Sequence, residues 1–314
     1  MSRPIVVVSP NLSLDRTNEV ASLRHGHVHR AIAVDVRGGG KGANVARALA
    51  AVGRSCTLIG LVAGRTGTAV DRLLEDEGIH LVSIPCPGET RSCLTVLDDA
   101  GTTVFNEPGP PHDPRAWEAL EAEVDASAVA GGVVVLSGSF PPGTPPEAAA
   151  GLVRSARARG CQSICDTSGP HLKAALRAGP DVVTPNLAEA RAVLEGDEGE
   201  AVDPGADGLA SAASCAAALV DQGAASALVT AGPLGAAGVL EGHRVDFPAH
   251  RVTVRNPVGA GDCLVAGMAA CLAEGAGLGP ATRFGIALAA ASCETLAAGA
   301  LDRKRAEELL ARTP

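Results

Sequence analysis

The stretch NPVGAGDCL, residues 256–264, places two glycines and an alanine directly before an acidic residue, Asp262. After Asp262, apolar residues recur at intervals of three and four, which predicts a loop that leads into a helix. The first turn of a helix has unpaired backbone N–H groups and the positive end of the helix dipole, so it suits a phosphate or a developing oxyanion. Asp262 then has two interpretations. It is an ordinary helix cap, or a general base that takes a proton from a hydroxyl while the adjacent amides hold a transferring phosphoryl group.

The composition favours a soluble protein that does not bind nucleic acid. The 314 residues carry a formal charge of -9 and the sequence pI is about 5.4, which argues against nucleic acid or an anionic membrane as a partner. No apolar run reaches the length of a membrane span, and we expect a cytoplasmic location. The nine cysteines form no C-x-x-C pair, so we expect buried free thiols. Cys263 is the one thiol that a helix start could make reactive, although a packing role is favoured for it as well.

Short apolar runs alternate with helical patterns along the chain, which predicts an α/β fold with a mostly parallel sheet covered by helices on both faces. The expected strands include residues 5–8, 56–62, 133–136, 162–165, 182–183 and 227–230. Polar residues follow these strands, where an open sheet gathers its ligand site: Asn11, Asp15, Ser137, Ser139, Asp166, Asn186, Glu189 and Thr230. Each residue alone is more often a cap or turn former, but their shared edge favours a site.

Two segments, about residues 13–35 and 89–107, do not fit this alternation. Alternating apolar residues from Val28 to Val36 predict strands exposed on one face, and Asp-Asp-Ala-Gly at residues 98–101 predicts a hairpin. We expect the two segments to pair with each other as a small separate sheet. Residues 1–314 then form one domain with an appended lid.

A second glycine-rich stretch, RGGGKGAN at residues 37–44, is expected as a loop before a helix at residues 45–52. Its Gly-x-Gly-x-x-Ala pattern matches a dinucleotide fingerprint, so a nicotinamide enzyme is an alternative, although the next strand ends without an acidic residue for ribose. It is not a Walker A motif, because no Ser or Thr follows the lysine in the required place. The glycines can also be hinges. We favour a loop whose backbone approaches a polyhydroxyl ligand, with Lys41 and Asn44 as polar contacts.

Residues 39–49, GGKGANVARAL, resemble the first signature of the PfkB (ribokinase-like) carbohydrate kinases, and residues 259–262 with Ala266 and Gly267 resemble the second. Residues 11–17, 137–143 and 185–189 resemble the branch that contains 1-phosphofructokinase, tagatose-6-phosphate kinase and the minor bacterial 6-phosphofructokinase. The resemblance covers essentially the whole chain. It implies a three-layer α/β/α ribokinase-like fold with a β-sheet lid that often builds a dimer interface, so a homodimer through the lid is expected.

The resemblance also implies a reaction in which ATP, with Mg²⁺, phosphorylates a ketohexose phosphate. Fructose 1-phosphate is the first expectation, and tagatose 6-phosphate and fructose 6-phosphate are alternatives. Asp262 would be the base, and the amides of Gly259, Ala260, Gly261 and Asp262 would form the anion hole. The sugar would meet Asp15, Gly39, Lys41 and Asn44, its phosphate Arg91 and Ser139, the magnesium ion Asn186 and Glu189, and the nucleotide Thr230, Gly232 and Gly235.

Five residues depart from the family pattern, and two of them, Pro257 and Cys263, remove no group that the chemistry needs. Thr184 replaces a common lysine, which affects the expected nucleotide-phosphate contacts. His27 and His29 occupy a stretch where the lid is expected to contact substrate, and a substrate contact and a surface position are equally open for both. A catalytically silent sugar-phosphate sensor is a further alternative on the same fold, and the presence of Asp262, Asn186 and Glu189 argues against it.

Overall fold

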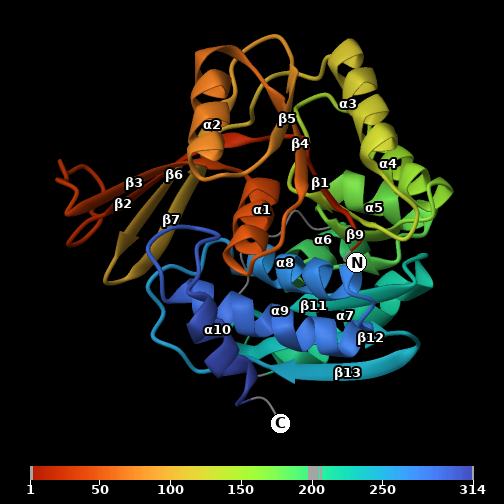
Figure 1. The fold of residues 1–314 in the computed structure, drawn as a ribbon. Coiled ribbons are helices and arrows are strands. Elements are labelled where there is room, and N and C mark those ends of the chain that lie inside the picture. Colours follow the sequence, from red (N-terminus) through yellow and green to blue (C-terminus); the bar gives the residue numbers. More distant parts are fainter. Residues whose placement is uncertain (1–2, 197–204, 206, 313–314) are drawn as a thin grey trace.

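The computed structural model describes residues 3–196, 205 and 207–312. In this part of the chain, a nine-stranded sheet is covered by helices on both faces, and a four-stranded sheet projects from one side (Figure 1). The strands of the large sheet are β1 (Ile5–Ser9), β4 (Thr57–Val62), β5 (Leu81–Pro85), β8 (Val133–Ser137), β9 (Gln162–Asp166), β10 (Val182–Val183), β11 (Ser226–Thr230), β12 (Gly235–Leu240) and β13 (His243–Pro248). The small sheet consists of β2 (Ser13–Glu19), β3 (Ala33–Gly39), β6 (Arg91–Asp98) and β7 (Gly101–Asn106).

The large sheet confirms the predicted α/β fold. Its order is β13-β12-β11-β10-β9-β8-β1-β4-β5. The strands from β11 to β5 in this order are parallel, whereas β12 pairs in antiparallel fashion with both β11 and β13. Because β1 lies between β4 and β8, the direction in which successive strands are added reverses at β1. In an open α/β sheet, such a reversal marks the ligand site at the carboxyl ends of the strands.

Helices cover both faces because the central strands are apolar on both sides. In β1, Val6 and Val8 belong to one apolar core, and Ile5 and Val7 belong to the other. The first core includes α3 (Pro114–Ser127), α4 (Glu147–Ala158), α5 (Gly169–Ala178), α6 (Leu187–Glu195) and α7 (Gly208–Asp221). The second includes α1 (Lys41–Ala51), α2 (Gly64–Asp76), α8 (Ala260–Ala273), α9 (Leu278–Cys293) and α10 (Arg303–Leu310). The predicted three layers are therefore confirmed. Within the described residues, no helix is both long enough and apolar enough to cross a membrane.

The small sheet joins two segments that are far apart in the sequence, as predicted. β2 pairs with β3 in antiparallel fashion and with β6 in parallel, and β7 pairs with β6. The expectation that the strand pattern includes residues 28–32 is wrong. Val28 is 91% exposed and Ile32 is 68% exposed, and the strand begins only at Ala33, where the chain meets Glu19 of β2. The backbone of Ile32 donates one hydrogen bond to the oxygen of Glu19 at 2.7 Å, and β2 ends at that residue, so the segment before Ile32 has no strand beside it to continue the ladder.

The two helices that follow the glycine-rich motifs begin earlier than the sequence indicated, α1 by four residues and α8 by one, since a start at Gly261 was expected. α1 begins at Lys41, inside the expected loop, and α8 begins at Ala260, before Asp262. The residue before each helix is a glycine with a positive φ, 97° at Gly40 and 86° at Gly259, which glycine adopts without the steric cost of a Cβ atom. The polar residues of both motifs therefore project from helical turns of fixed geometry.

α8 packs closely against α9 because two glycines meet at the contact. A Cβ atom on Gly285 of α9 would overlap the carbonyl oxygen of Leu264 in α8. A Cβ atom on Gly267 of α8 would in turn overlap the backbone of Gly285. α8 is buried along most of its length, so this contact helps to fix the helix whose first turn carries Asp262.

We expect Gly285→Ala to lower the free energy of unfolding by about 1–3 kcal/mol, because the backbone atoms it meets cannot move aside as a flexible side chain can. Gly279→Ala is the matched control in the same helix, since nothing lies within 4 Å of the Cβ atom that it would add. Urea denaturation followed by circular dichroism measures both variants. Equal stability of the two variants would contradict the close packing of α8 on α9.

Candidate active site

Polar residues from five neighbouring strands meet at the edge where these parallel strands end. Asp166 and Thr230 end β9 and β11, and Asn11, Ser139 and Asn186 follow β1, β8 and β10. This edge adjoins β1, where the order of the sheet reverses. The residues that were singled out after separate strands thus share one region of the molecule, and the first turns of α1, α6 and α8 contribute to it.

Asp262 is buried in the first turn of α8, with 5% of its surface exposed. The N-cap of α8 is Gly259, so the interpretation of Asp262 as the helix cap is wrong. Its carboxylate accepts a hydrogen bond from Asn44, with 2.8 Å between Nδ2 and Oδ2. Ala260 and Gly261, directly before it, line a cavity. The carboxylate therefore lies at the positive end of a helix, next to a space that a ligand can enter.

The pKa of Asp262 is raised to about 7. Burial is the main cause, and the nearby Asp166 carboxylate adds to it. The charge of Lys41 and the hydrogen bond from Asn44 lower the pKa, and the carboxylate of Asp15 raises it. A carboxylate with a pKa near neutrality exchanges a proton at physiological pH, which is a requirement for a general base.

Lys41 lies between two carboxylates. Its Nζ is 3.3 Å from Oδ1 of Asp166 and 3.1 Å from Oε1 of Glu189. Burial alone would lower the pKa of Lys41, but Asp166, Glu189 and Asp262 outweigh burial and raise that pKa above its usual value. Burial raises the pKa of Asp166, and Lys41 opposes this effect. Ser137 donates a further hydrogen bond to Oδ2 of Asp166 at 3.2 Å.

Asn186 and Glu189, the predicted magnesium residues, bond to each other at the start of α6. Oδ1 of Asn186 accepts a hydrogen bond from the backbone of Glu189, and Oε2 of Glu189 accepts one from the backbone of Asn186, each at 2.9 Å. Oε1 of Glu189 contacts Lys41, so these oxygens already have protein partners. Across residues 3–196, 205 and 207–312, no cluster of three or more His, Cys, Asp or Glu side chains could hold a metal ion. The residues fit a Mg²⁺ ion that keeps its water molecules better than one bound directly.

Asp15, predicted to contact the sugar, lies against the glycine-rich stretch. Its carboxylate accepts a hydrogen bond from Oγ of Ser13 at 2.5 Å and one from the backbone of Gly40 at 3.4 Å. A Cβ atom on Gly39 would overlap this carboxylate, so a side chain at residue 39 would displace Asp15 from its present position. The stretch connects β3 of the small sheet to α1 and does not follow a strand of the parallel sheet. It therefore lacks the setting that a dinucleotide fingerprint requires.

Asn11 links the two residues predicted to contact the sugar's phosphate. Its backbone oxygen accepts a hydrogen bond from Nε of Arg91 at 3.2 Å, and its side chain donates one to Oγ of Ser139 at 3.2 Å. Arg91 is half-buried at the start of β6, and Ser139 is exposed. A residue of the small sheet and a residue that follows β8 are thereby brought to the same part of the site.

All three residues predicted to contact the nucleotide line a cavity of about 670 Å³. Together with residues from the starts of α6 and α8, they form part of its lining: Thr230, Gly232, Gly235, Asn186, Ala260 and Gly261. The sequence did not indicate the remaining wall, which includes most of residues 249–254 and four residues of α9, Ile286, Ala289, Ala290 and Cys293. These residues have only the periodicity of a packed helix and a loop without a motif, so no local signal distinguished them.

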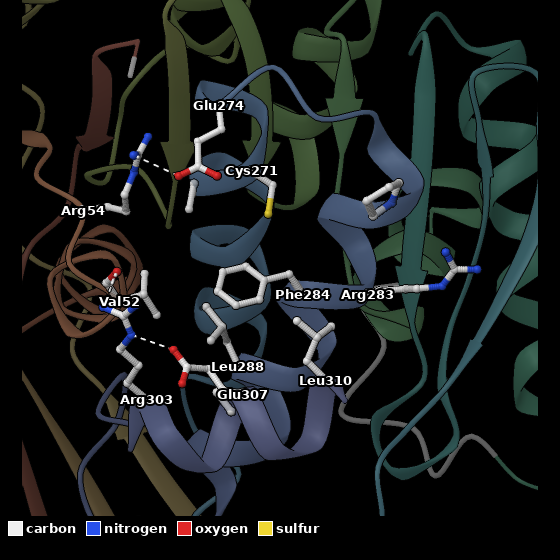
Figure 2. Close-up of a pocket in the computed structure, with 13 residues that line it drawn as sticks. Val52, Arg54, Cys271, Glu274, Arg283, Phe284, Leu288, Arg303, Glu307 and Leu310 are labelled. Atoms are coloured by element: carbon white, nitrogen blue, oxygen red, sulfur yellow. Dashed lines mark hydrogen bonds and ion pairs between the residues drawn. The ribbon is translucent and has the colours of Figure 1, made fainter. Parts of the chain in front are cut away.

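A second cavity, of about 490 Å³, lies at the far ends of α1 and α8 (Figure 2). The ring of Phe284 points into it, and two ion pairs lie beside it. Arg54 is 3.0 Å from Glu274, and Arg303 is 2.9 Å from Glu307. None of the predicted site residues, all of which the structure describes, lines this cavity. The residues that line this cavity therefore do not belong to the candidate site at the edge of the large sheet.

Other sequence expectations have mixed outcomes. The nine cysteines, all within the described residues, are free, as expected. The idea that Cys263 is reactive is wrong, because the residue is buried and burial raises the pKa of its thiol to about 12. The hydroxyl of Thr184 is buried and has no hydrogen-bond partner among the described residues. His27 is exposed, and Nε2 of His29 lies 3.0 Å from the backbone oxygen of Arg24 in the same loop.

Comparison with known proteins shows the same family that the motifs indicate. Residues 7–304 match the pfkB family carbohydrate kinase domain. ATP-dependent 6-phosphofructokinase isozyme 2 of Escherichia coli (strain K12) is 34% identical over 258 residues, which cover 81% of this chain and 81% of that protein. 1-Phosphofructokinase of Rhodobacter capsulatus is 34% identical over 272 residues, which cover 85% of this chain and 83% of that protein.

The fold gives the same result. The solved structure of the tetrameric inhibited form of phosphofructokinase-2 from Escherichia coli matches with a TM-score of 0.85 at 31% sequence identity, and the match covers 99% of each chain. In both the sequence and the fold, the similarity extends over the body of the chain and the small sheet. This chain therefore belongs to the pfkB family of carbohydrate kinases, and it is a sugar kinase.

Proposed function

We propose that this kinase transfers a phosphoryl group from ATP to a ketohexose phosphate, and that fructose 1-phosphate is converted to fructose 1,6-bisphosphate. The observation that carries the proposal is the position of the buried Asp262 in the first turn of α8, directly after two residues that line the large cavity and hydrogen-bonded to Asn44 of α1. Relatives named 1-phosphofructokinase and 6-phosphofructokinase support a sugar phosphate as the acceptor. Tagatose 6-phosphate and fructose 6-phosphate are the competing acceptors.

Asp262 is the general base in this proposal. Its ionised carboxylate takes the proton from the acceptor hydroxyl, the hydroxyl oxygen bonds to the γ-phosphorus of ATP, and the bond from that phosphorus to ADP breaks. The amides of Gly259, Ala260, Gly261 and Asp262 would stabilise the charge on the transferring group. Phosphoryl transfer depends mainly on positioning and on charge stabilisation, which buried groups on fixed elements supply.

The large cavity would bind the nucleotide through Thr230, Gly232 and Gly235. Mg²⁺ supplies positive charge that offsets the charge of the phosphates, and Asn186 and Glu189 would hold it through water. Lys41 adds a permanent positive charge to the same region, because neighbouring carboxylates keep its pKa above the usual value.

The sugar would contact Asp15, Gly39, Lys41 and Asn44, and its phosphate would contact Arg91 and Ser139. Two hydrogen bonds hold the guanidinium of Arg91 in place, from Nε to the backbone of Asn11 and from Nη1 to the backbone of Glu107. A guanidinium has five N–H donors, so others are left for a phosphate. Its planar shape matches phosphate oxygens well.

The small sheet would act as the lid of this site and form the interface of a homodimer. Val34 and Phe105 are exposed, and the strand register places them on the same face of the sheet. Exposed apolar residues that share a face favour an interface. Phe105→Asp should shift the full-length protein toward the monomer in sedimentation velocity experiments. An unchanged distribution of species would contradict the lid interface.

The substrate is tested by measuring kcat/KM with Mg-ATP for fructose 1-phosphate, fructose 6-phosphate and tagatose 6-phosphate, beside unphosphorylated fructose and ribose. We expect one phosphorylated ketohexose to be clearly preferred. Arg91→Ala should then raise the KM for that substrate by about 10- to 100-fold, the loss typical of hydrogen bonds to a charged group, and leave the KM for ATP nearly unchanged. A preference for free sugars would overturn the choice of acceptor. Absence of turnover with every acceptor would favour the silent sensor.

Asp262→Asn should lower kcat by roughly 10² to 10⁴, the usual effect of removing a general base, with little change in ATP affinity measured by calorimetry. In the unmodified enzyme, kcat/KM should fall as the pH decreases through about 7, because the protonated carboxyl group cannot accept a proton. The variant should lack this acidic limb. If kcat of the variant equalled that of the unmodified enzyme, Asp262 would not be the base.

A further inference from the structure

Arg47 is a buried arginine that the motif-based roles do not explain. It lies one turn after Asn44 in α1, and its side chain is 8% exposed. Its guanidinium donates to both carboxylate oxygens of Glu77, the residue that follows α2, with 3.1 Å between Nη2 and Oε1. It also donates to the backbone oxygens of Gly38 at 2.6 Å and of Ala298 at 3.3 Å, and to Oδ1 of Asn44 at 2.9 Å.

The contact with Arg47 determines which way the amide of Asn44 faces. A guanidinium only donates hydrogen bonds, so it must face the oxygen of the amide. The amino group of Asn44 is then directed to Asp262, where it donates to Oδ2 at 2.8 Å. Rotation of the amide by half a turn would bring its amino group to the guanidinium and its oxygen to the carboxylate. Both new contacts would be repulsive.

Arg47 also contacts Ala298, and the segment that contains Ala298 packs against the start of α8. Gly299 lies so close to Asn44 that a Cβ atom on it would come within 2.8 Å of Cα of Asn44. A Cβ atom on Gly259, the N-cap of α8, would come within 2.7 Å of the backbone nitrogen of Gly299. The segment that accepts a hydrogen bond from Arg47 therefore packs between α1 and the start of α8.

We propose that Arg47, held by Glu77, is a positioning residue that fixes the Asn44 amide so that it donates to Asp262. The inference deepens the proposed function, because it assumes that Asp262 is the base. Loss of Arg47 would allow the amide to rotate and present its oxygen to the carboxylate, which disfavours the charged form of Asp262. Asp166, Asp15 and Lys41, the other charged groups that act on Asp262, would remain in place.

The test compares Arg47→Met with Arg54→Met in the full-length enzyme. Arg54 follows α1 at its opposite end and pairs with Glu274 at 3.0 Å beside the second cavity, so the control also removes a largely buried arginine from an ion pair (Figure 2). We expect Arg47→Met to move the acidic limb of the kcat/KM profile to higher pH by about one unit, which is a loss of about fivefold at pH 7 that approaches tenfold at lower pH and narrows at alkaline pH. The KM for ATP should stay unchanged, and Arg54→Met should have an unchanged profile.

A second measurement does not depend on activity. The chain has six asparagines, so selective ¹⁵N labelling gives few side-chain amide signals, and Asn44→Ser identifies the relevant one. In the unmodified protein this signal should titrate with Asp262, and Arg47→Met should move the midpoint upward. Glu77→Gln, which keeps the volume of the side chain, should give a smaller shift in the same direction, and Arg47→Lys should partly restore the original midpoint.

The outcomes separate the two proposals. Uniform loss of kcat at every pH, with an unchanged amide midpoint, would reduce Arg47 to a structural residue and overturn the inference. A shifted midpoint in a protein without kinase activity on any acceptor would leave the effect of Arg47 on Asn44 and Asp262 intact and refute Asp262 as a kinase base. If Arg47→Met does not fold, Glu77→Gln provides the same comparison, and an unchanged midpoint in that variant would also overturn the inference.

Discussion

Burial of the Asp262 carboxylate is the constraint on which the arrangement of this site depends. Removing a carboxylate from water disfavours its charge, so nearby groups must compensate for lost hydration. Asn44 supplies a hydrogen bond and Lys41 supplies a positive charge, while Asp166 acts in the opposite direction. These groups come from α1 and β9, and the carboxylate itself comes from α8. The pKa of Asp262 therefore depends on the large sheet, on α1 and α8, and on the segment at Ala298 and Gly299 that packs between these helices, all folded together.

The sequence predicted the fold well where a local pattern had one structural meaning. Continuous apolar runs such as residues 5–8 are central parallel strands with one core on each side. The alternation of apolar and polar residues from Val28 gave a wrong strand prediction, because a strand needs a neighbouring strand and Val28 is 91% exposed in a loop. The start of α1 was predicted too late, since Gly40 was taken as part of a longer loop, although it directly precedes the helix.

The candidate site was predictable in its motifs and not in its surroundings. Residues after separate strands do gather at one edge, because parallel strands end on the same side. Most of residues 249–254 line the large cavity, yet their position depends on how the chain returns from β13 to α8, which no short pattern encodes. The sequence predicted only that Arg47 lies in a helix and within the first signature, with no role for its side chain. Its partner Glu77 is thirty residues away, so only the tertiary structure pairs them.

The small sheet and α8 are held by different parts of the molecule, and this separation has an evolutionary consequence. α8 is fixed in the body by a contact between glycines, Gly267 and Gly285, that leaves no room for a side chain. Asp15 and Arg91 lie instead on strands whose neighbours belong to the small sheet. Under the proposed function, a lineage could exchange one sugar phosphate for another by changing strand positions of the small sheet, while selection keeps the transfer machinery constant. Diversification of substrates on one inherited catalytic helix would then require few coordinated mutations.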